Sequence, residues 1–186
     1  MASVLIPLAD GFEEIEAVTV IDVLRRGGVE VVTASIGEDE SVAGAHGIDV
    51  KADAMFEDVA DADYDAIVLP GGGEGVDNLK AYPPLAELLV RQKGEGRLIC
   101  AICAAPTLLT GIEGLVDDGI HLTCYPTLSL ELDRPCANAP AVEDGQFITG
   151  QAPGAAMIFA LVVLRALTGD KLAMRVAAGL VTNVMQ

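Results

Sequence analysis

The feature that most constrains the fold of this chain is the alternation of short apolar runs with longer segments of helical character. Each run is nearly continuous in Val, Ile, Leu and Ala. Such runs separated by helices are typical of a mainly parallel sheet covered by helices on both faces. The predicted strands are Ser3–Leu8, 29–36, 64–73, 96–102, 120–125 and 146–150, with a small strand or hairpin at 43–53, and the predicted helices are 13–26, 84–93, 104–110, 154–167 and 170–179.

Length and composition predict one soluble domain spanning residues 1–186. Hydrophobic residues make up 52% of the chain, enough for a large core. The longest apolar segment, residues 152–164, is interrupted by Pro153 and Gly154, so it is too short for a membrane span and fits a buried helix. The N-terminus lacks the basic region and cleavage site of a secretion signal, so we expect a cytoplasmic protein.

The formal net charge of −17 excludes two classes of partner. Phosphates of nucleic acids and anionic membrane surfaces would both be repelled by such a surface, so we expect neither. A salt-adapted host and an ordinary acidic cytoplasmic protein explain the charge equally well. The four cysteines, in a chain without a secretion signal, are expected as reduced thiols rather than disulfides.

Three stretches that contain candidate functional residues follow predicted strands: ADGFEEIE, LPGGGEG and ICAICAAP. In parallel α/β sheets, sites lie at the carboxyl ends of the strands, where these stretches would meet. The last of them places Cys103 between a strand and a helix, with Ala101, Ala104 and Ala105 leaving room for a sharp turn. The positive end of the helix would favour the thiolate and hold the pKa of Cys103 well below its usual value of about 8.5. An inert core cysteine is the alternative, and spacing alone does not decide between them.

Glu16 is the second candidate. On a helical wheel it falls within an apolar arc of roughly 160°. A carboxyl on a buried arc requires a partner or a proton, and beside a thiolate it would stay protonated and donate a hydrogen bond. Alternatively, Glu13, Glu14 and Glu16 are first-turn acids that complement the helix dipole, an interpretation that suits Glu14 best. Glu13 also lies within the arc, so the wheel does not single out Glu16. The arc consists of Ala17, Val20, Ile21, Val23 and Leu24.

The glycines of PGGGEG, residues 70–75, let backbone N–H groups approach a ligand closely, as an oxyanion hole or anion nest does. No Lys-Ser or Lys-Thr follows, and the loop is outside the first strand–helix unit. A phosphate-binding loop of the Walker or dinucleotide type is therefore not favoured.

The segments GFEEIEAV, LPGGGEGVDNL and AICAAPTLL, in this order and spacing, resemble the ThiJ/PfpI superfamily, in particular its parkinsonism-associated deglycase-like branch. The resemblance extends from Ser3 to about Gly179. It implies a flavodoxin-like three-layer sandwich, a homodimer, and no metal or organic cofactor. It also implies a reactive cysteine at Cys103 and a partner glutamate at Glu16. The backbone donors would be Gly72 and Ala104, and the pocket would be lined by Gly71, Tyr125 and Pro153.

The resemblance implies a cofactor-free glyoxalase or deglycase acting on a small aldehyde or dicarbonyl. The alternative is a redox sensor or chaperone in which Cys103 oxidises to a sulfinate capped by protonated Glu16. A protease of the PfpI type is a remote alternative, because that branch has a histidine where this chain has Ala104. Many relatives also carry a histidine where this chain has Tyr125, which argues against a Cys-His pair. The Gly-Pro-Gly of the family is Ala152-Pro153-Gly154 here.

The other cysteines receive structural interpretations. Cys100 forms a C-x-x-C with Cys103, but on an extended strand it should point away from the helix start. Cys124 could approach the site as filler or as a resolving thiol, and Cys136 is interpreted as a bystander in a loop. No motif places His46 or His121, and the spacing of cysteines and histidines predicts no zinc site.

Overall fold

The computed structural model describes residues 1–182 and forms a seven-stranded sheet between two helical layers. The strand order is β5-β2-β1-β6-β7-β9-β8, and all neighbours are parallel except β8 and β9. A separate hairpin joins β3 to β4. The strands are β1 (Ser3–Leu8), β2 (Glu30–Ser35), β3 (Ser41–Ala43), β4 (Asp49–Lys51), β5 (Ala54–Met55), β6 (Ala66–Leu69), β7 (Leu98–Ile102), β8 (Ala141–Asp144) and β9 (Phe147–Gly150).

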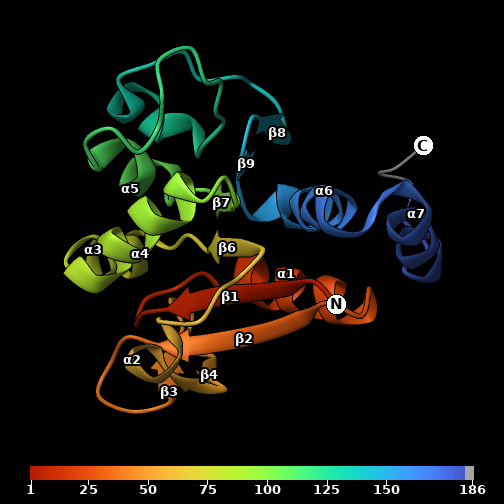
Figure 1. Cartoon of the computed structure of the whole chain (residues 1–186), viewed down its shortest axis with the longest axis horizontal. Helices are drawn as coiled ribbons and strands as arrows, with labels where there is room; N and C mark the ends of the chain where they lie inside the picture. Colours follow the sequence, from red (N-terminus) through yellow and green to blue (C-terminus); the bar gives the residue numbers. More distant parts are fainter. Residues whose placement is uncertain (183–186) are drawn as a thin grey trace.

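The helices divide between the two faces of the sheet. One core layer joins the sheet to α1, α6 and α7, and the other joins it to α2, α3, α4 and α5. In Figure 1, α3, α4 and α5 lie together, apart from α6 and α7 near the C-terminus. The helices are α1 (Glu14–Arg26), α2 (Phe56–Val59), α3 (Gly73–Lys80), α4 (Pro83–Gly94), α5 (Pro106–Gly111), α6 (Ala156–Thr168) and α7 (Asp170–Gly179), with 3-10 turns η1 (Pro126–Leu132) and η2 (Pro153–Ala155).

The alternation of side chains along the strands explains why the sheet needs both layers. Val68 and Cys100 face the α1–α6 layer, whereas their neighbours Ile67 and Ile99 face the α3–α5 layer. All four are buried, which accounts for the nearly continuous apolar runs in the sequence. The predicted α/β sandwich with a mainly parallel sheet is therefore confirmed.

The structure corrects several boundaries. The predicted strand at 120–125 does not form; only an isolated bridge joins Leu122 to Cys136. The backbone of this segment does not pair with a neighbouring strand; the N–H of Thr123, for example, donates to the side-chain Oγ1 of Thr149. Strand β8 is the edge strand on this side of the sheet. Helix α3, which begins within the predicted glycine loop, and strand β8 are not predicted by the sequence. Among the described residues, no helix is both long enough and apolar enough to cross a membrane.

Candidate active site

The three sequence stretches meet because their strands are neighbours in the sheet. Strand β6 pairs with β1 on one side and β7 on the other, all parallel, so the carboxyl ends of the three lie side by side. Glu16 lies in the first turn of the helix that follows β1. Gly71 and Gly72 follow β6, and Cys103 is the residue directly after β7.

Cys103 occupies a sharp elbow. It has a positive φ of 65°, a backbone conformation that non-glycine residues rarely adopt. Its N–H donates to the carbonyl of Gly150 at 3.0 Å, and its own carbonyl accepts the N–H of Tyr125 at 2.8 Å. Strain of this kind costs about 1–3 kcal/mol and persists only where surrounding contacts enforce it. The elbow leaves the residue 8% exposed at the strand end.

Glu16 is held beside this elbow by its neighbours. Its residue is fully buried. Glu13 caps the helix, with its carboxylate accepting the N–H of Glu16 at 2.8 Å, and Oε2 of Glu16 accepts the N–H of Gly71 at 2.7 Å. Oε1 has no hydrogen bond of standard geometry to any residue that the structure describes. The carboxyl and the Cys103 thiol nevertheless interact closely enough to shift the pKa of both groups.

Gly71 makes this approach possible because it has no side chain. A Cβ at this position would lie 2.5 Å from Oε2 of Glu16 and 2.7 Å from Cβ of Cys103. Gly72 is constrained differently, by a positive φ of 95° at the start of α3. Gly71 therefore lets the loop after β6 lie against both the carboxyl and the thiol-bearing residue, and Gly72 lets the same loop lie against the backbone of residues 11–13.

The acidities of the pair differ from the sequence-based expectation. Burial, with the nearby Glu16 carboxyl, raises the pKa of Cys103 to about 12, although the N–H groups of Ala104 and Gly72 act in the opposite direction. The expected low thiol pKa is therefore wrong. Helix α5 begins only at Pro106, not at Ala104, so the helix end is farther from the sulfur than expected. Burial also raises the pKa of Glu16 to about 7.

These acidities define which form of the pair can react. Near neutral pH the first proton leaves the pair, and the second is retained until strongly alkaline pH. Transfer of the thiol proton to the Glu16 carboxylate then produces a thiolate without adding charge to the site. The arrangement can therefore combine a nucleophile with a general base.

Comparisons with known proteins identify the family of this chain. Residues 2–166 match the model of the DJ-1/PfpI family. The chain belongs to the DJ-1/PfpI family. Protein DJ-1 homolog B of Arabidopsis thaliana is 42% identical over 96% of this chain, but the match covers 41% of that relative, so this chain spans less than half of its length. A structure of oxidized Toxoplasma gondii DJ-1 has a TM-score of 0.93 at 34% identity, and the match covers 98% of this chain and all of that one.

Another member of the DJ-1/PfpI family bears a functional name. The Glutathione-independent glyoxalase DJR-1.2 of Caenorhabditis elegans is 36% identical over 91% of this chain and 90% of its own length.

The structure brings Cys103, Glu16, Gly71, Gly72 and Ala104 together at the site. Tyr125, 41% exposed, contacts the site through its backbone N–H. Pro153 begins the turn that follows Gly150.

Glu14 and His46 form a second polar contact near the site. Glu14 lies in the first turn of α1, as the sequence predicted. It is also buried, and its carboxylate accepts the backbone N–H of His46 at 2.5 Å and contacts Nδ1 of His46 at 2.8 Å. Burial opposes ionisation, yet these bonds lower the pKa of Glu14 to about 2. With Glu13, the two residues form a group of potential metal ligands, but both carboxylates already accept N–H bonds, so we assign no metal there.

The remaining cysteines of this DJ-1/PfpI protein lie elsewhere. Cys100 is fully buried in β7, and burial raises its pKa. Cys136, interpreted as a bystander from the sequence, instead lies with its Sγ 3.7 Å from Sγ of Cys124. Because this contact joins two segments without regular secondary structure, no periodicity in the sequence could have indicated it.

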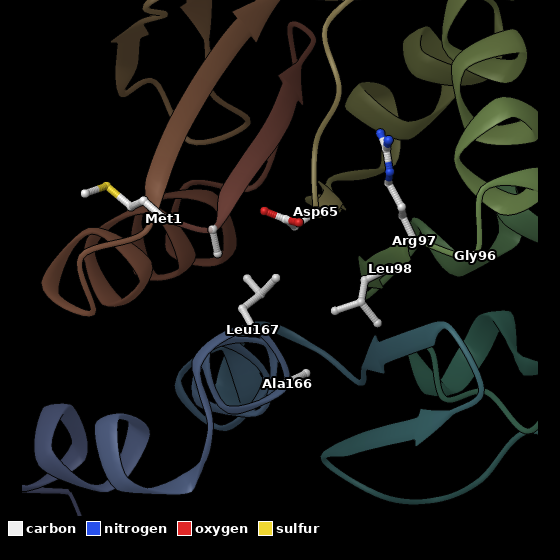
Figure 2. A pocket seen from close by; sticks show the side chains of 8 residues that line it. Met1, Asp65, Gly96, Arg97, Leu98, Ala166 and Leu167 are labelled. Atoms are coloured by element: carbon white, nitrogen blue, oxygen red, sulfur yellow. The ribbon is translucent and has the colours of Figure 1, made fainter.

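A pocket of about 510 Å³ lies at the opposite end of the strands (Figure 2). Its lining includes Asp65 and Leu98, which stand at the beginnings of β6 and β7, and Leu167 at the end of α6. Figure 2 shows an acid, a guanidinium and aliphatic side chains around it, without a cysteine or histidine. We therefore place the reactive site at the Cys103–Glu16 pair. The lining residues are Met1, Ala2, Asp65, Gly96, Arg97, Leu98, Ala166 and Leu167.

Proposed function

We propose that this protein converts small reactive dicarbonyls of the methylglyoxal type into 2-hydroxy acids, without a cofactor, through Cys103 and Glu16. The observation that carries the proposal is the buried carboxyl beside a thiol on a strained strand-end elbow. The similarity to the C. elegans relative named a glyoxalase supports the same reaction class. A deglycase reaction would use the same nucleophile on a hemithioacetal already formed elsewhere.

The reaction begins when the Glu16 carboxylate takes the proton of the Cys103 thiol. The sulfur then attacks the aldehyde carbon, a C–S bond forms, and the carbonyl electron pair moves to the oxygen. The N–H groups of Gly72 and Ala104 interact with the sulfur in the free protein, and in the proposed reaction they would donate to that oxyanion. Glu16 returns its proton to that oxyanion and, as a carboxylate again, takes the proton from the former aldehyde carbon. It delivers this proton to the neighbouring carbon while the hydroxyl proton moves to the second carbonyl oxygen, which leaves a thioester with a 2-hydroxyl group. Water finally cleaves the resulting thioester and releases the 2-hydroxy acid.

Turnover of methylglyoxal by purified protein tests this proposal. We expect Cys103→Ser to lower kcat/KM by about a thousandfold or more, because the hydroxyl is a far weaker nucleophile at this site. Cys100→Ser, which changes a buried thiol outside the pair, serves as the matched control and should retain turnover. Turnover by Cys103→Ser equal to wild type would refute the proposal.

A second function, redox sensing, is favoured by one specific observation. Oε1 of Glu16 lies buried without a standard hydrogen bond beside the thiol, where a protonated carboxyl could donate to a sulfinate on Cys103. Tyr125 in place of the family histidine also weakens the case for turnover. The two functions share residues, and the turnover experiment separates them.

The proposal extends to the cellular compartment and the oligomeric state of the protein. We propose a cytoplasmic homodimer, in agreement with four free thiols and with exposed apolar side chains on α1 and the β3–β4 hairpin. The exposed side chains are Ile15, Val18 and Ile48, which are 57%, 47% and 58% exposed.

A further inference from the structure

A second pair of thiols lies outside the Cys103–Glu16 site. Sγ of Cys124 and Sγ of Cys136 are 3.7 Å apart, although twelve residues separate them in sequence. Their proximity is imposed by the backbone. Ala137 N donates to the carbonyl of Leu122 at 2.8 Å, and the hydroxyl of Thr123 donates to the carbonyl of Ala139 at 3.0 Å. These two bonds hold the segments side by side next to the sulfur contact.

The two thiols differ in their access to solvent. Cys124 is 1% exposed, whereas Cys136 is half-buried. Both line a pocket of about 270 Å³, together with Ser129 and Gln151, and this pocket admits a molecule as small as hydrogen peroxide. Burial is the main cause that raises the pKa of Cys124 to about 12, and the contact with Cys136 is the second. Because Cys136 is the more exposed of the two thiols, it is placed to meet peroxide first, and the buried Cys124 is placed to attack the oxidised sulfur.

We propose that Cys124 and Cys136 form a redox site that closes to an intrachain disulfide when the protein meets hydrogen peroxide. This proposal does not rest on the proposed reaction at Cys103. It also revises the sequence-based interpretation, in which Cys136 had no role.

The chemistry proceeds in two balanced steps. The Cys136 thiolate attacks one peroxide oxygen, the O–O bond breaks, and hydroxide leaves with a proton as water, so that Cys136 becomes a sulfenic acid. The Cys124 sulfur then attacks the sulfenic sulfur, the S–O bond breaks, and a second water leaves with the Cys124 proton. Two thiols thus lose two electrons in total to one peroxide. The sulfur atoms must approach from 3.7 Å to a bond length of about 2.0 Å.

The neighbourhood links this site to the elbow. Tyr125, directly after Cys124, donates its N–H to the carbonyl of Cys103 at 2.8 Å, and η1 begins at the next residue. Closing the disulfide therefore alters the segment that holds the Cys103 backbone in place.

Peptide mapping of peroxide-treated protein tests the proposal. Reduced wild-type protein is treated with graded hydrogen peroxide, remaining thiols are blocked with N-ethylmaleimide, and the chain is cleaved after glutamate. Cleavage after Glu131 separates the two cysteines, whereas trypsin is hindered at Arg134 by the following Pro135. We expect a linked peptide pair containing Cys124 and Cys136 that disappears on reduction with dithiothreitol.

Variants make the test specific. Cys103→Ser should form the same linked pair, because the site does not use Cys103. Cys124→Ser should remove it and raise trapping of Cys136 sulfenic acid by dimedone several-fold, since no second thiol resolves it. The proposal is overturned if both thiols stay open to N-ethylmaleimide after Cys103 is fully oxidised. It is equally overturned if the link forms only between two chains.

Discussion

Glu16→Gln is expected to slow alkylation of Cys103 by iodoacetamide at pH 7 about a hundredfold. In the wild type, the pair loses its first proton near pH 7, and the Glu16 carboxylate can then accept the thiol proton. Glutamine cannot accept it, while burial still holds the pKa of the Cys103 thiol above its ordinary value. The expected slowing comes from the loss of a positioned general base, which contributes a factor of about 10²–10⁴ to a step that needs proton transfer.

The sign of the pH dependence follows from the same acidities. Wild-type alkylation should rise with pH through a midpoint near 7, whereas that of Glu16→Gln should rise only above about pH 9. Glu14→Gln is the matched control, because this neighbouring acid contacts His46 rather than the thiol. Equal rates for Glu16→Gln and wild type at pH 7 would show that the carboxyl does not control the thiol. Peptide mass spectrometry, which reads alkylation at Cys103 alone, provides the measurement.

Gly71→Ala is expected to abolish most of the reactivity with the smallest possible side chain. The added methyl would lie 2.5 Å from Oε2 of Glu16, 2.7 Å from Cβ of Cys103 and 3.0 Å from the carbonyl of Ile102. At least one of these groups must move. Overpacking of this kind costs about 1–3 kcal/mol of stability, and a displacement of about 1 Å at a reacting group lowers rates about a hundredfold.

Gly73→Ala is the control for that substitution. A Cβ at Gly73 meets no atom within 4 Å, so this variant should keep wild-type reactivity and melting temperature. Thermal denaturation and Cys103 alkylation, measured on both variants, separate loss of fold from loss of geometry. If Gly71→Ala behaves like Gly73→Ala, the close packing of Gly71 against the Glu16 carboxyl and Cys103 is refuted.

The alternation of apolar runs and helices was sufficient to predict the sheet and both helical layers, because buried parallel strands need apolar residues on both faces. Local sequence patterns predicted the wrong secondary structure where tertiary contacts determine the conformation. The run at 120–125 has strand composition, yet its backbone N–H groups bond to side chains of β8 and β9 and to the Cys103 elbow rather than to the backbone of a neighbouring strand. Helix α3 was missed because glycines at residues 73 and 75 disfavour a helix locally, and packing of Val76 and Leu79 overrides that preference.

The site itself was partly predictable. Adjacent strand ends predicted that the stretches around Glu16 and Cys103 would meet, whereas the choice of Glu16 over Glu13 rested on the family resemblance. The acidity of Cys103 could not be predicted in this way, because burial outweighs the amide donors and is set by the packed fold. Nor could the Cys124–Cys136 contact, which depends on how two irregular segments cross.

The pH dependence of kcat/KM for methylglyoxal tests the central claim most directly, because this quantity reports the ionisation of the free protein. If Cys103 and Glu16 act as one nucleophile–base pair, kcat/KM rises through a midpoint near pH 7. That rise should persist in Glu14→Gln and disappear in Glu16→Gln. A wild-type profile with its midpoint near pH 9, or one that Glu16→Gln leaves unchanged, would contradict the account.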